Sequence, residues 1–442
     1  MKSLFCFMLT LMSIFTLTTD FTLAQQLRWR VLPAGFVSPT RLEDICFINA
    51  NTGWTITNYS DQFGGDHHHI FKTTNGGKSW SDQSDSSSIY YRCIGFADSL
   101  NGWIGMLSRD NVPIIRTTNG GANWFPSLVT PITDTNNVCG LSVINKNIVY
   151  GCGRYCGPSR FYKTTNGGVN WTVKDMSQYA TGLVDIHFFS ADSGFVVGGT
   201  GGIWPDMNAV VLFTSDGGET WVERHRTVRS QEWGWKISFP TRNTAYISLE
   251  SWISDNQFLK TTNGGVNWIE KPFVSGYNQE GIGFINENTG WLGGGPMTYK
   301  TTNGGDNWFA DNIGARMNRF RFINDTLGYA VGQKILKFSR DSTTGINVIS
   351  NEIPAKFYLE QNYPNPFNPG TKIRFEVASP TADMRLEVYN SLGQLVETLV
   401  DKILRTGTYE VEFSAANHPS GIYYYRLITN NYAEVKKMIL VK

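Results

Sequence analysis

Asp185, Glu250 and Glu280 are the residues whose type and expected position could support hydrolysis, because they fall near strand ends or in loops. Cleavage of a glycosidic bond takes two facing carboxyl groups, about 5 Å apart in retaining enzymes or about 6.5–9.5 Å apart in inverting ones. Loop carboxylates are also common on any solvated face, and the sequence has no G-x-S-x-G, H-E-x-x-H or Ca²⁺-loop motif. We therefore treat these three carboxylates as weak catalytic candidates and expect no catalytic set.

A second group of residues could bind a ligand without cleaving it. Aromatic and arginine side chains are enriched at binding faces, where rings stack on sugars or on peptide side chains. Here they gather in segments expected to form one rim of the molecule. The ligand-binding candidates are Tyr91, Arg92, Tyr155, Trp204, Trp233, Trp235, Trp252 and Arg319. The alternative is that part of this group packs in the interior.

Neither a metal site nor a cofactor is expected from the sequence. Neighbouring residues on a strand point to opposite faces, so the three histidines of His67–His69 cannot share one ion unless the loop curls. The cysteines beyond the N-terminal segment form no C-x-x-C pair, and we interpret them as structural. Cys152 with Cys156, or Cys139 with Cys152, could form a disulfide.

The N-terminal 24 residues differ in character from the rest of the chain. Lys2 precedes an apolar run from Leu4 to Leu17, and Thr22-Leu23-Ala24 is similar to a small-residue cleavage site. Such a run is short for a transmembrane helix, so we expect a cleaved export signal at residues 1–24 and no transmembrane segment. A net charge of +1, from 38 basic and 37 acidic side chains, gives no reason to expect nucleic acid as a partner.

The elements that must position these residues come from a repeat. The sequence KTTNGGVNW occurs at residues 163–171 and again at 260–268, with near copies elsewhere, and the six motif tryptophans stand at 80, 124, 171, 221, 268 and 308. Steps of 40 to 50 residues are typical of β-propeller blades. Each unit has an upstream half with alternating apolar residues around a polar turn, as in ICFINANTGW at Ile45–Trp54. Two hairpins give the four strands of one blade.

The upstream half occurs seven times, whereas the tryptophan half occurs six times. The segment QLRWRVLP at Gln26–Pro33 has the pattern of the missing last strand, with Trp29 in the place of the motif tryptophan. We therefore predict an all-β protein with a seven-bladed propeller over residues 25–345, closed by a strand from the mature N-terminus.

The repeated motif has its own structural interpretation. Asn-Gly at the centre of a two-residue loop is typical of a type I′ hairpin, and the tryptophan can fold over the turn. These motif residues are expected to be structural: Asn75, Trp80, Asn119, Trp124, Asn166, Trp171, Asp216, Trp221, Asn263, Trp268, Asn303 and Trp308.

The C-terminal part of the chain does not contain the propeller repeat and has a different residue pattern. Residues 346–356 are expected to be a linker, and residues 357–442 show period-two alternation with short turns. Pro364, Pro366 and Pro369 exclude a helix at the start of this part. We predict a small immunoglobulin-like β-sandwich.

Two family resemblances follow from these motifs. TSDGGETW at Thr214–Trp221 resembles the aspartate box (BNR repeat), and the Thr-Thr-Asn-Gly-Gly-x-x-Trp copies most resemble the photosystem II assembly factor family of seven-bladed propellers. In those families the boxes lie on outer hairpins away from the central site, which implies that they carry no catalysis. The resemblance implies the fold; a photosynthetic role does not suit an exported chain.

The tail closely resembles the type A C-terminal sorting domain of the type IX secretion system. The resemblance rests on Pro-Asn-Pro-Phe-Asn-Pro at 364–369, VYNSLGQLV at 388–396, SGIYYYRL at 420–427 and Lys436-Lys437. It implies that residues 357–442 engage the secretion machinery. The product is then extracellular or on the outer cell surface, reached through the periplasm.

Taken together, the sequence favours an exported, non-catalytic propeller that binds a glycan or a protein on its loop-rich face. The alternative is a carbohydrate-active glycoside hydrolase of the aspartate-box propeller type.

Overall fold

The computed structural model describes most of the chain beyond the N-terminal segment. The described residues are 27–32, 41–60, 66–84, 90–107, 112–131, 137–253, 256–273, 279–340, 347–350, 352–415 and 418–442. The expected export signal at 1–24 lies outside them. All helices and strands assigned within the described residues are β-strands, which agrees with the predicted all-β class. These residues hold no helix that could cross a membrane.

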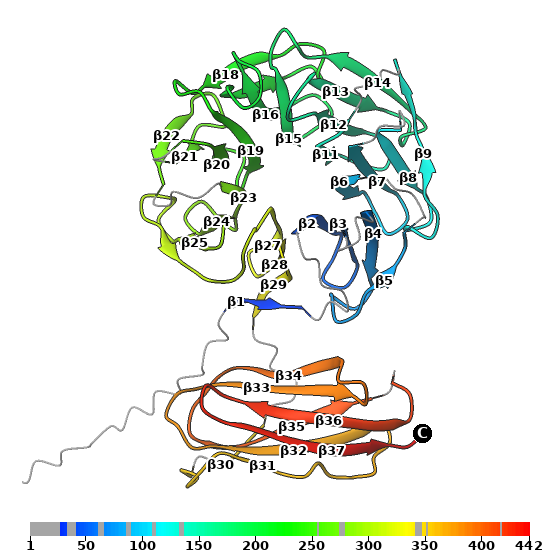
Figure 1. The fold of residues 1–442 in the computed structure, drawn as a ribbon, viewed down its shortest axis with the longest axis vertical. Coiled ribbons are helices and arrows are strands. Elements are labelled where there is room, and N and C mark those ends of the chain that lie inside the picture. The colour runs from blue at the N-terminus through cyan, green and yellow to red at the C-terminus, as the bar shows by residue number, and fades with distance from the viewer. Residues whose placement is uncertain are drawn as a thin grey trace, which may run out of the picture.

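Seven of the sheets formed by the described residues are arranged as blades in a ring (Figure 1). Blade 1 contains β2 (Arg41–Phe47), β3 (Gly53–Ser60), β4 (Asp66–Thr73) and β5 (Ser81–Asp82). Blade 2 contains β6 (Tyr90–Phe96), β7 (Gly102–Leu107), β8 (Ile114–Thr117) and β9 (Phe125–Pro126). Blade 3 contains β11 (Gly140–Val143), β12 (Val149–Gly153), β13 (Arg160–Thr164) and β14 (Asn170–Asp175). Blade 4 contains β15 (Gly182–Phe188), β16 (Gly194–Thr200), β17 (Asn208–Thr214) and β18 (Val222–Arg226). Blade 5 contains β19 (Glu232–Ser238), β20 (Ala245–Ser251), β21 (Gln257–Thr261) and β22 (Ile269–Pro272). Blade 6 is β23 (Gln279–Phe284), β24 (Gly290–Gly294), β25 (Thr298–Thr301) and β26 (Phe309–Ala310).

Blade 7 is completed from the other end of the chain, as the sequence predicts. It contains β27 (Arg319–Asn324), β28 (Leu327–Val331) and β29 (Ile335–Arg340), and β1 (Leu27–Val31) pairs antiparallel with β29. Trp29 lies opposite Phe338 in this pairing, and its ring meets Trp291 of blade 6 edge to face at 5.5 Å between centroids. The motif tryptophans contact the preceding blade in the same way; Trp268, for example, packs edge-on to Phe195.

Blade 3 has a fifth strand that the repeat does not predict. β10 (Leu128–Thr130), from the connection between blades 2 and 3, pairs parallel with the outer strand β14. Val129 lies opposite Trp171 and is buried. This strand covers an edge that is otherwise open to solvent.

The repeated motif forms a turn that differs from the predicted two-residue type I′ loop. The positive φ values belong to the two glycines, 72° at Gly76 and 88° at Gly77, and the asparagine stays outside that region. The Asn75 Oδ1 atom instead accepts the backbone N–H of Ser79 at 3.0 Å, and Thr73 Oγ1 accepts that of Gly77 at 3.0 Å. The asparagine therefore acts through its side chain, which leaves the left-handed conformation to glycine.

The motif lysine ties one blade to the next. Lys72 Nζ donates to the carbonyl of Gly120 in the following turn at 2.9 Å, and Lys260 Nζ donates to Gly304 at 2.7 Å. In blade 7, Lys337 Nζ reaches back to Gly76 of blade 1 at 3.3 Å. Repetition of the motif thus supplies contacts between neighbouring blades as well as turns within them.

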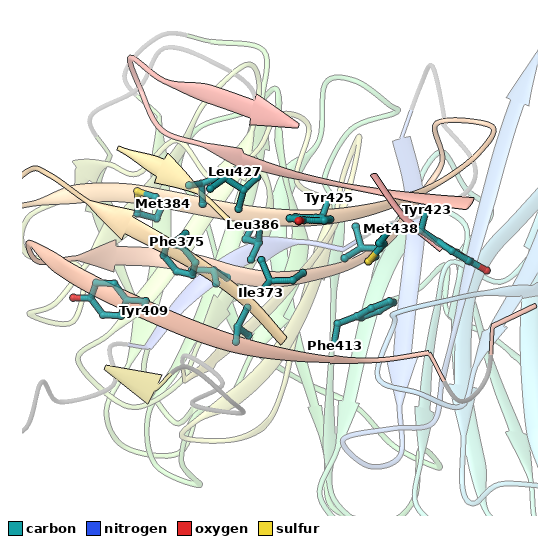
Figure 2. Packing of buried hydrophobic residues seen from close by; sticks show 14 of the residues in the cluster. Ile373, Phe375, Met384, Leu386, Tyr409, Phe413, Tyr423, Tyr425, Leu427 and Met438 are labelled. Atoms are coloured by element: carbon teal, nitrogen blue, oxygen red, sulfur yellow. The ribbon is translucent and has the colours of Figure 1, made fainter. Parts of the chain in front are cut away.

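The C-terminal domain is a sandwich of two four-stranded sheets. One sheet contains β30 (Asn347–Ser350), β35 (Gly407–Ser414), β32 (Gly370–Val377) and β31 (Tyr358–Leu359). The other contains β34 (Leu395–Leu404), β33 (Ala382–Asn390), β36 (Gly421–Ile428) and β37 (Ala433–Leu440). Figure 2 shows the core between them, where Phe375, Leu386, Tyr425 and Met438 pack together. β30 falls within residues 346–356, the expected linker, so part of that segment pairs with the sandwich.

The sandwich lies beside the blade that closes the ring (Figure 1). Lys78 of the motif turn in blade 1 approaches Glu397 of β34 at 3.3 Å, and Arg28 of β1 approaches Asp401 at 3.6 Å. Both pairs are partly exposed, so each contributes about 0–1 kcal/mol.

Candidate functional site

The innermost strand of each blade faces the central axis of the propeller. In Figure 1 these strands are β2, β6, β11, β15, β19, β23 and β27. The Asn-Gly-Gly motif turns lie at the end where each third strand meets the fourth, beside the turn between the first and second strands. The opposite end carries the loop between the second and third strands of each blade and the connections between blades. The ligand-binding candidates therefore belong to this rim and to the adjoining channel.

One ion network in the channel centres on Arg319 of β27. Its Nη1 and Nη2 atoms donate to the two carboxylate oxygens of Asp185 on β15 at 2.8 and 3.0 Å, and its Nε lies 3.2 Å from Asp44 of β2. Burial opposes ionisation of Asp185, but Arg319 and Lys236 outweigh it and hold the pKa of that carboxyl well below its usual range. The structure thus brings the predicted residues Asp185 and Arg319 together. Both are buried and occupied with each other, which suits a structural tie between blades.

A second network joins β2, β6 and β23. Glu43 forms an ion pair with Arg92 and accepts a hydrogen bond from Tyr90 Oη at 2.6 Å. Arg41 bridges Glu43, at 3.2 Å, and Glu280, at 2.5 Å. Burial alone disfavours the charge of Glu43, yet Arg41 and Arg92 lower the pKa of this carboxyl to about 2.

Trp235 links these networks across the channel. Its Nε1 atom donates to Asn318 Oδ1 at 3.0 Å, and Asn318 Nδ2 donates to the carbonyl of Glu43 at 2.7 Å. The guanidinium of Arg92 lies 5.1 Å from the centre of the Trp235 ring. Next to it, burial followed by repulsion from Arg319 and Arg92 lowers the pKa of Lys236 to about 7. Trp235 is therefore a buried channel residue and presents no free ring to a ligand.

Glu250 lies near the charged residues Glu280, Arg41 and Arg92 of the second network. It lies on β20 directly opposite Trp233 of β19, and its Oε2 atom is buried without a hydrogen-bond partner in the described part of the chain. Burial and the neighbouring Glu280 charge raise the pKa of Glu250 to about 7. The structure thus brings Glu250 and Glu280 close enough to influence each other, with Glu280 ion-paired to Arg41.

Aromatic rings form a continuous cluster on the rim of blades 3 to 5. The Trp204 ring lies 6.0 Å from Tyr155, 6.1 Å from Trp233 and 5.7 Å from Trp252, all edge to face. Trp204 is 37% exposed and Trp252 is 57% exposed, whereas Trp233 is buried beneath them. Such pairs are worth about 0.5–1.5 kcal/mol beyond their buried area. We call the three accessible rings, Tyr155, Trp204 and Trp252, the aromatic rim.

The loops that carry the aromatic rim are held by backbone contacts. Trp252 N donates to the carbonyl of Gln231 at 3.0 Å, and Asp206 N donates to that of Ile203 at 2.6 Å. Gln231 has φ at 62°, a conformation that a non-glycine residue rarely adopts. Gly202 has no room for a side chain, because an added Cβ would lie 2.2 Å from the carbonyl of Asp206.

The remaining candidates are divided between interior and other surfaces. Tyr91 is buried between blades 1 and 2, where its backbone pairs with the side chain of Asn58.

His68 and His69 point apart, His68 to Asn58 Oδ1 and His69 to Asp82, both at 2.8 Å. Within the described residues no group of three His, Cys, Asp or Glu could hold a metal ion. The thiols of the described cysteines are free, including the pairs considered for a disulfide.

Three polar residues that hold the channel together are absent from the predicted site. Glu43 and Asp44 lie among the apolar residues of β2, and Asn318 precedes β27. Charged residues inside an apolar strand pattern are the available signal, because a buried charge needs a partner. The sequence does not reveal which partner each one takes.

Comparison with known proteins identifies the C-terminal domain. Residues 361–442 match the secretion system C-terminal sorting domain, so the chain ends in a domain of this family. Such domains mark proteins exported by the type IX secretion system, and this protein is therefore secreted or displayed on the outer cell surface. No curated protein matches the sequence.

Solved structures support the fold. A structure described as YCF48 bound to D1 peptide is similar with a TM-score of 0.52 at 16% identity, over 71% of this chain and 97% of that one. PorZ, a surface component of the type IX secretion system of Porphyromonas gingivalis, gives 0.51 at 11% identity, over 93% of this chain and 61% of that one. The extracellular domain of BT4673 from B. thetaiotaomicron gives 0.51 at 8% identity, over 95% and 58%. This chain thus spans about three fifths of the latter two proteins, and the likeness concerns the fold alone.

Proposed function

We propose that this exported propeller is a non-catalytic binding module and that its ligand lies on the aromatic rim of Tyr155, Trp204 and Trp252. The exposed, mutually packed rings carry this proposal. Large rigid rings supply contact area at small cost in conformational entropy. The buried Trp233 and the hydrogen-bonded loops support them from below.

The ligand is a glycan or a protein segment. A sugar ring would stack on the accessible faces, and a peptide would place an apolar side chain between Trp204 and Trp252. The D1 peptide held by YCF48, a propeller of similar fold, makes a peptide a reasonable member of the panel. Both ligand classes rely on the same two rings, so one pair of substitutions tests the site.

The test uses the purified full-length chain and a panel of soluble polysaccharides and peptides. Retention on each ligand and release of reducing sugar are scored together. We expect retention without release. The double variant Trp204→Ala/Trp252→Ala should bind at least tenfold more weakly, because central tryptophans of binding sites cost about 2 kcal/mol or more on truncation.

The matched control is Phe309→Ala, which removes a ring that is 64% exposed on the outer strand β26. Its binding should equal that of the wild type. If the double variant bound as tightly as the wild type, the aromatic rim would not be the site.

A glycoside hydrolase is the second candidate because of one observation. Burial and the neighbouring Glu280 raise the pKa of Glu250 to about 7, and a carboxyl group that keeps its proton near neutral pH suits a general acid. Release of reducing sugar that Glu250→Gln abolishes would establish this activity and refute the non-catalytic proposal.

The domain limits stay proposals of the same kind. We propose a mature chain that starts after residue 24, a propeller over 25–345, and residues 357–442 as the part that binds the secretion machinery. Mass spectrometry of the exported protein would test both ends, and a mature N-terminus other than Gln25 would revise the first.

A further inference from the structure

The C-terminal domain has an edge strand that its own chain covers. The segment 361–368, which contains most of the Pro-Asn-Pro-Phe-Asn-Pro motif, runs along β37. Phe367 N donates to the carbonyl of Ile439 at 2.9 Å, and Val441 N donates to that of Phe367 at 3.0 Å. Asn365 Oδ1 accepts the N–H of Ile439 at 2.9 Å. Because these backbone groups are satisfied, the C-terminal end of β37 is not open to the addition of a further strand.

The other edges of the sandwich offer little backbone for pairing. β31 has two residues and β30 has four. β34 lies towards the propeller, where Glu397 and Asp401 meet basic residues. A partner that adds a strand to this domain would therefore meet the covering segment at β37 and the propeller at β34, which directs attention to side chains on the surface of the domain.

One groove of about 650 Å³ lies on the outer side of the covering segment. It is bounded by that segment and by the outward side chains of β32 and β35, among them Tyr363, Asn368, Lys372 and Glu412. Tyr363 is 81% exposed, although its backbone is fixed by two hydrogen bonds with Lys372, at 2.9 and 3.0 Å. In the same motif Phe367 is 2% exposed and packs in the core.

The ring of Tyr363 adds little to the core of the domain. Because the backbone of Tyr363 is fixed by its hydrogen bonds with Lys372, the ring is held in a position where a partner can reach it. Nearby, Glu410 is satisfied by Lys372 at 3.0 Å and Arg374 at 2.7 Å, and Glu412 is exposed at the groove. The groove thus offers an aromatic anchor beside balanced charges and an additional acid.

We propose that this groove is the surface through which the sorting domain binds an extended protein segment of the type IX secretion machinery. An apolar side chain of that segment packs on the ring of Tyr363, and a basic group lies near Glu412. The proposal rests on the family of residues 361–442 and is independent of the ligand of the aromatic rim. It assigns the recognition to a side-chain groove and leaves β37 covered.

The test is export of the full-length chain in a bacterium with a working type IX system. The ratio of extracellular and surface-bound protein to periplasmic protein is measured for Tyr363→Ala and for Ile353→Ala. Ile353 lies outside residues 361–442, is 78% exposed and serves as the matched control. We expect Tyr363→Ala to lower the ratio at least tenfold, and Ile353→Ala and Tyr363→Phe to leave it unchanged.

A second variant fills the groove and keeps the tyrosine. Asn368→Trp, at an exposed groove residue, should also lower export at least tenfold. Thermal unfolding of the purified variants at the wild-type temperature would show that the fold is intact. Normal export of Tyr363→Ala overturns the proposal, and so does a defect of Tyr363→Ala that Asn368→Trp fails to reproduce.

Discussion

Replacement of Glu250 by glutamine should make the protein more stable at neutral and alkaline pH. Glu250 pairs with Trp233, which is buried beneath the aromatic rim, and burial followed by repulsion from Glu280 raises the pKa of its carboxyl to about 7 from an ordinary value of 4.5. Between these two pH values the folded protein binds more protons than the unfolded chain. Stability contributed by this group is therefore fully present below pH 4.5 and falls as the pH rises towards 7.

The magnitude follows from the difference between the two pKa values. One pKa unit is worth about 1.4 kcal/mol, so the difference between 4.5 and about 7 corresponds to about 3 kcal/mol above pH 7. Glutamine has nearly the same shape and carries no charge, so Glu250→Gln avoids this cost. For a domain of this size the gain corresponds to a rise in melting temperature on the order of 5 °C.

The assay compares melting temperatures of wild type and Glu250→Gln at pH 4.5, 6 and 8. Subtraction removes the contributions of other titrating groups, so the difference isolates residue 250. We expect almost no difference at pH 4.5 and the full rise at pH 8. A difference that is equal at both pH values, or a variant less stable than the wild type at pH 8, would refute the reasoning.

Three further outcomes follow from the fold and the tail. Trp29→Ala should lower the free energy of unfolding by about 3–5 kcal/mol, because the Trp29 ring packs where blade 7 is closed. Denaturant titration measures this change, and the exposed Phe309→Ala, measured in parallel, should change the free energy little. Asn263→Ala should cost about 1–2 kcal/mol in the same titration through lost turn hydrogen bonds, and Asn263→Asp should be tolerated because Asp216 makes the same contacts in blade 4. Deletion of residues 357–442 should leave the protein in the periplasm when cell fractions are probed; normal surface delivery would contradict this role of the tail.

The propeller could be predicted from sequence because each blade repeats a local code. The motif holds two glycines, a hydroxyl side chain and an asparagine or aspartate within nine residues. Its tryptophan follows the second glycine by three positions in every copy and packs against the preceding blade. The closing strand could be predicted because the upstream half of the repeat occurs once more than the tryptophan half. The segment around Trp29 has the pattern of the missing strand, and it pairs with β29. The conformation of the turn was predicted less well, because asparagine and glycine share a preference for positive φ.

The channel could not be predicted in the same way. Arg319 and Asp185 are 134 positions apart, and Asn318 and Glu43 are 275 apart. Closure of the ring brings these residues together, and no local periodicity records it. The sequence shows which residues are arginine or aromatic but not which of them are buried. Trp235 and Arg92 were therefore included among the ligand-binding candidates, although both are buried in the structure.

The ion pairs and hydrogen bonds that cross the channel bear on the choice between ligand binding and glycoside hydrolysis. A carboxyl group that cleaves a glycosidic bond must reach the substrate, and its partner must be free to act as base or nucleophile. Glu280 is 17% exposed and held by Arg41, and Asp185 is enclosed by Arg319. The hydrogen bond from Trp235 to Asn318 and the ion pair between Arg319 and Asp185 both cross the channel. The rings of Trp204 and Trp252 stay exposed on the aromatic rim. These observations support the proposal that the propeller holds a ligand on this rim without cleaving it.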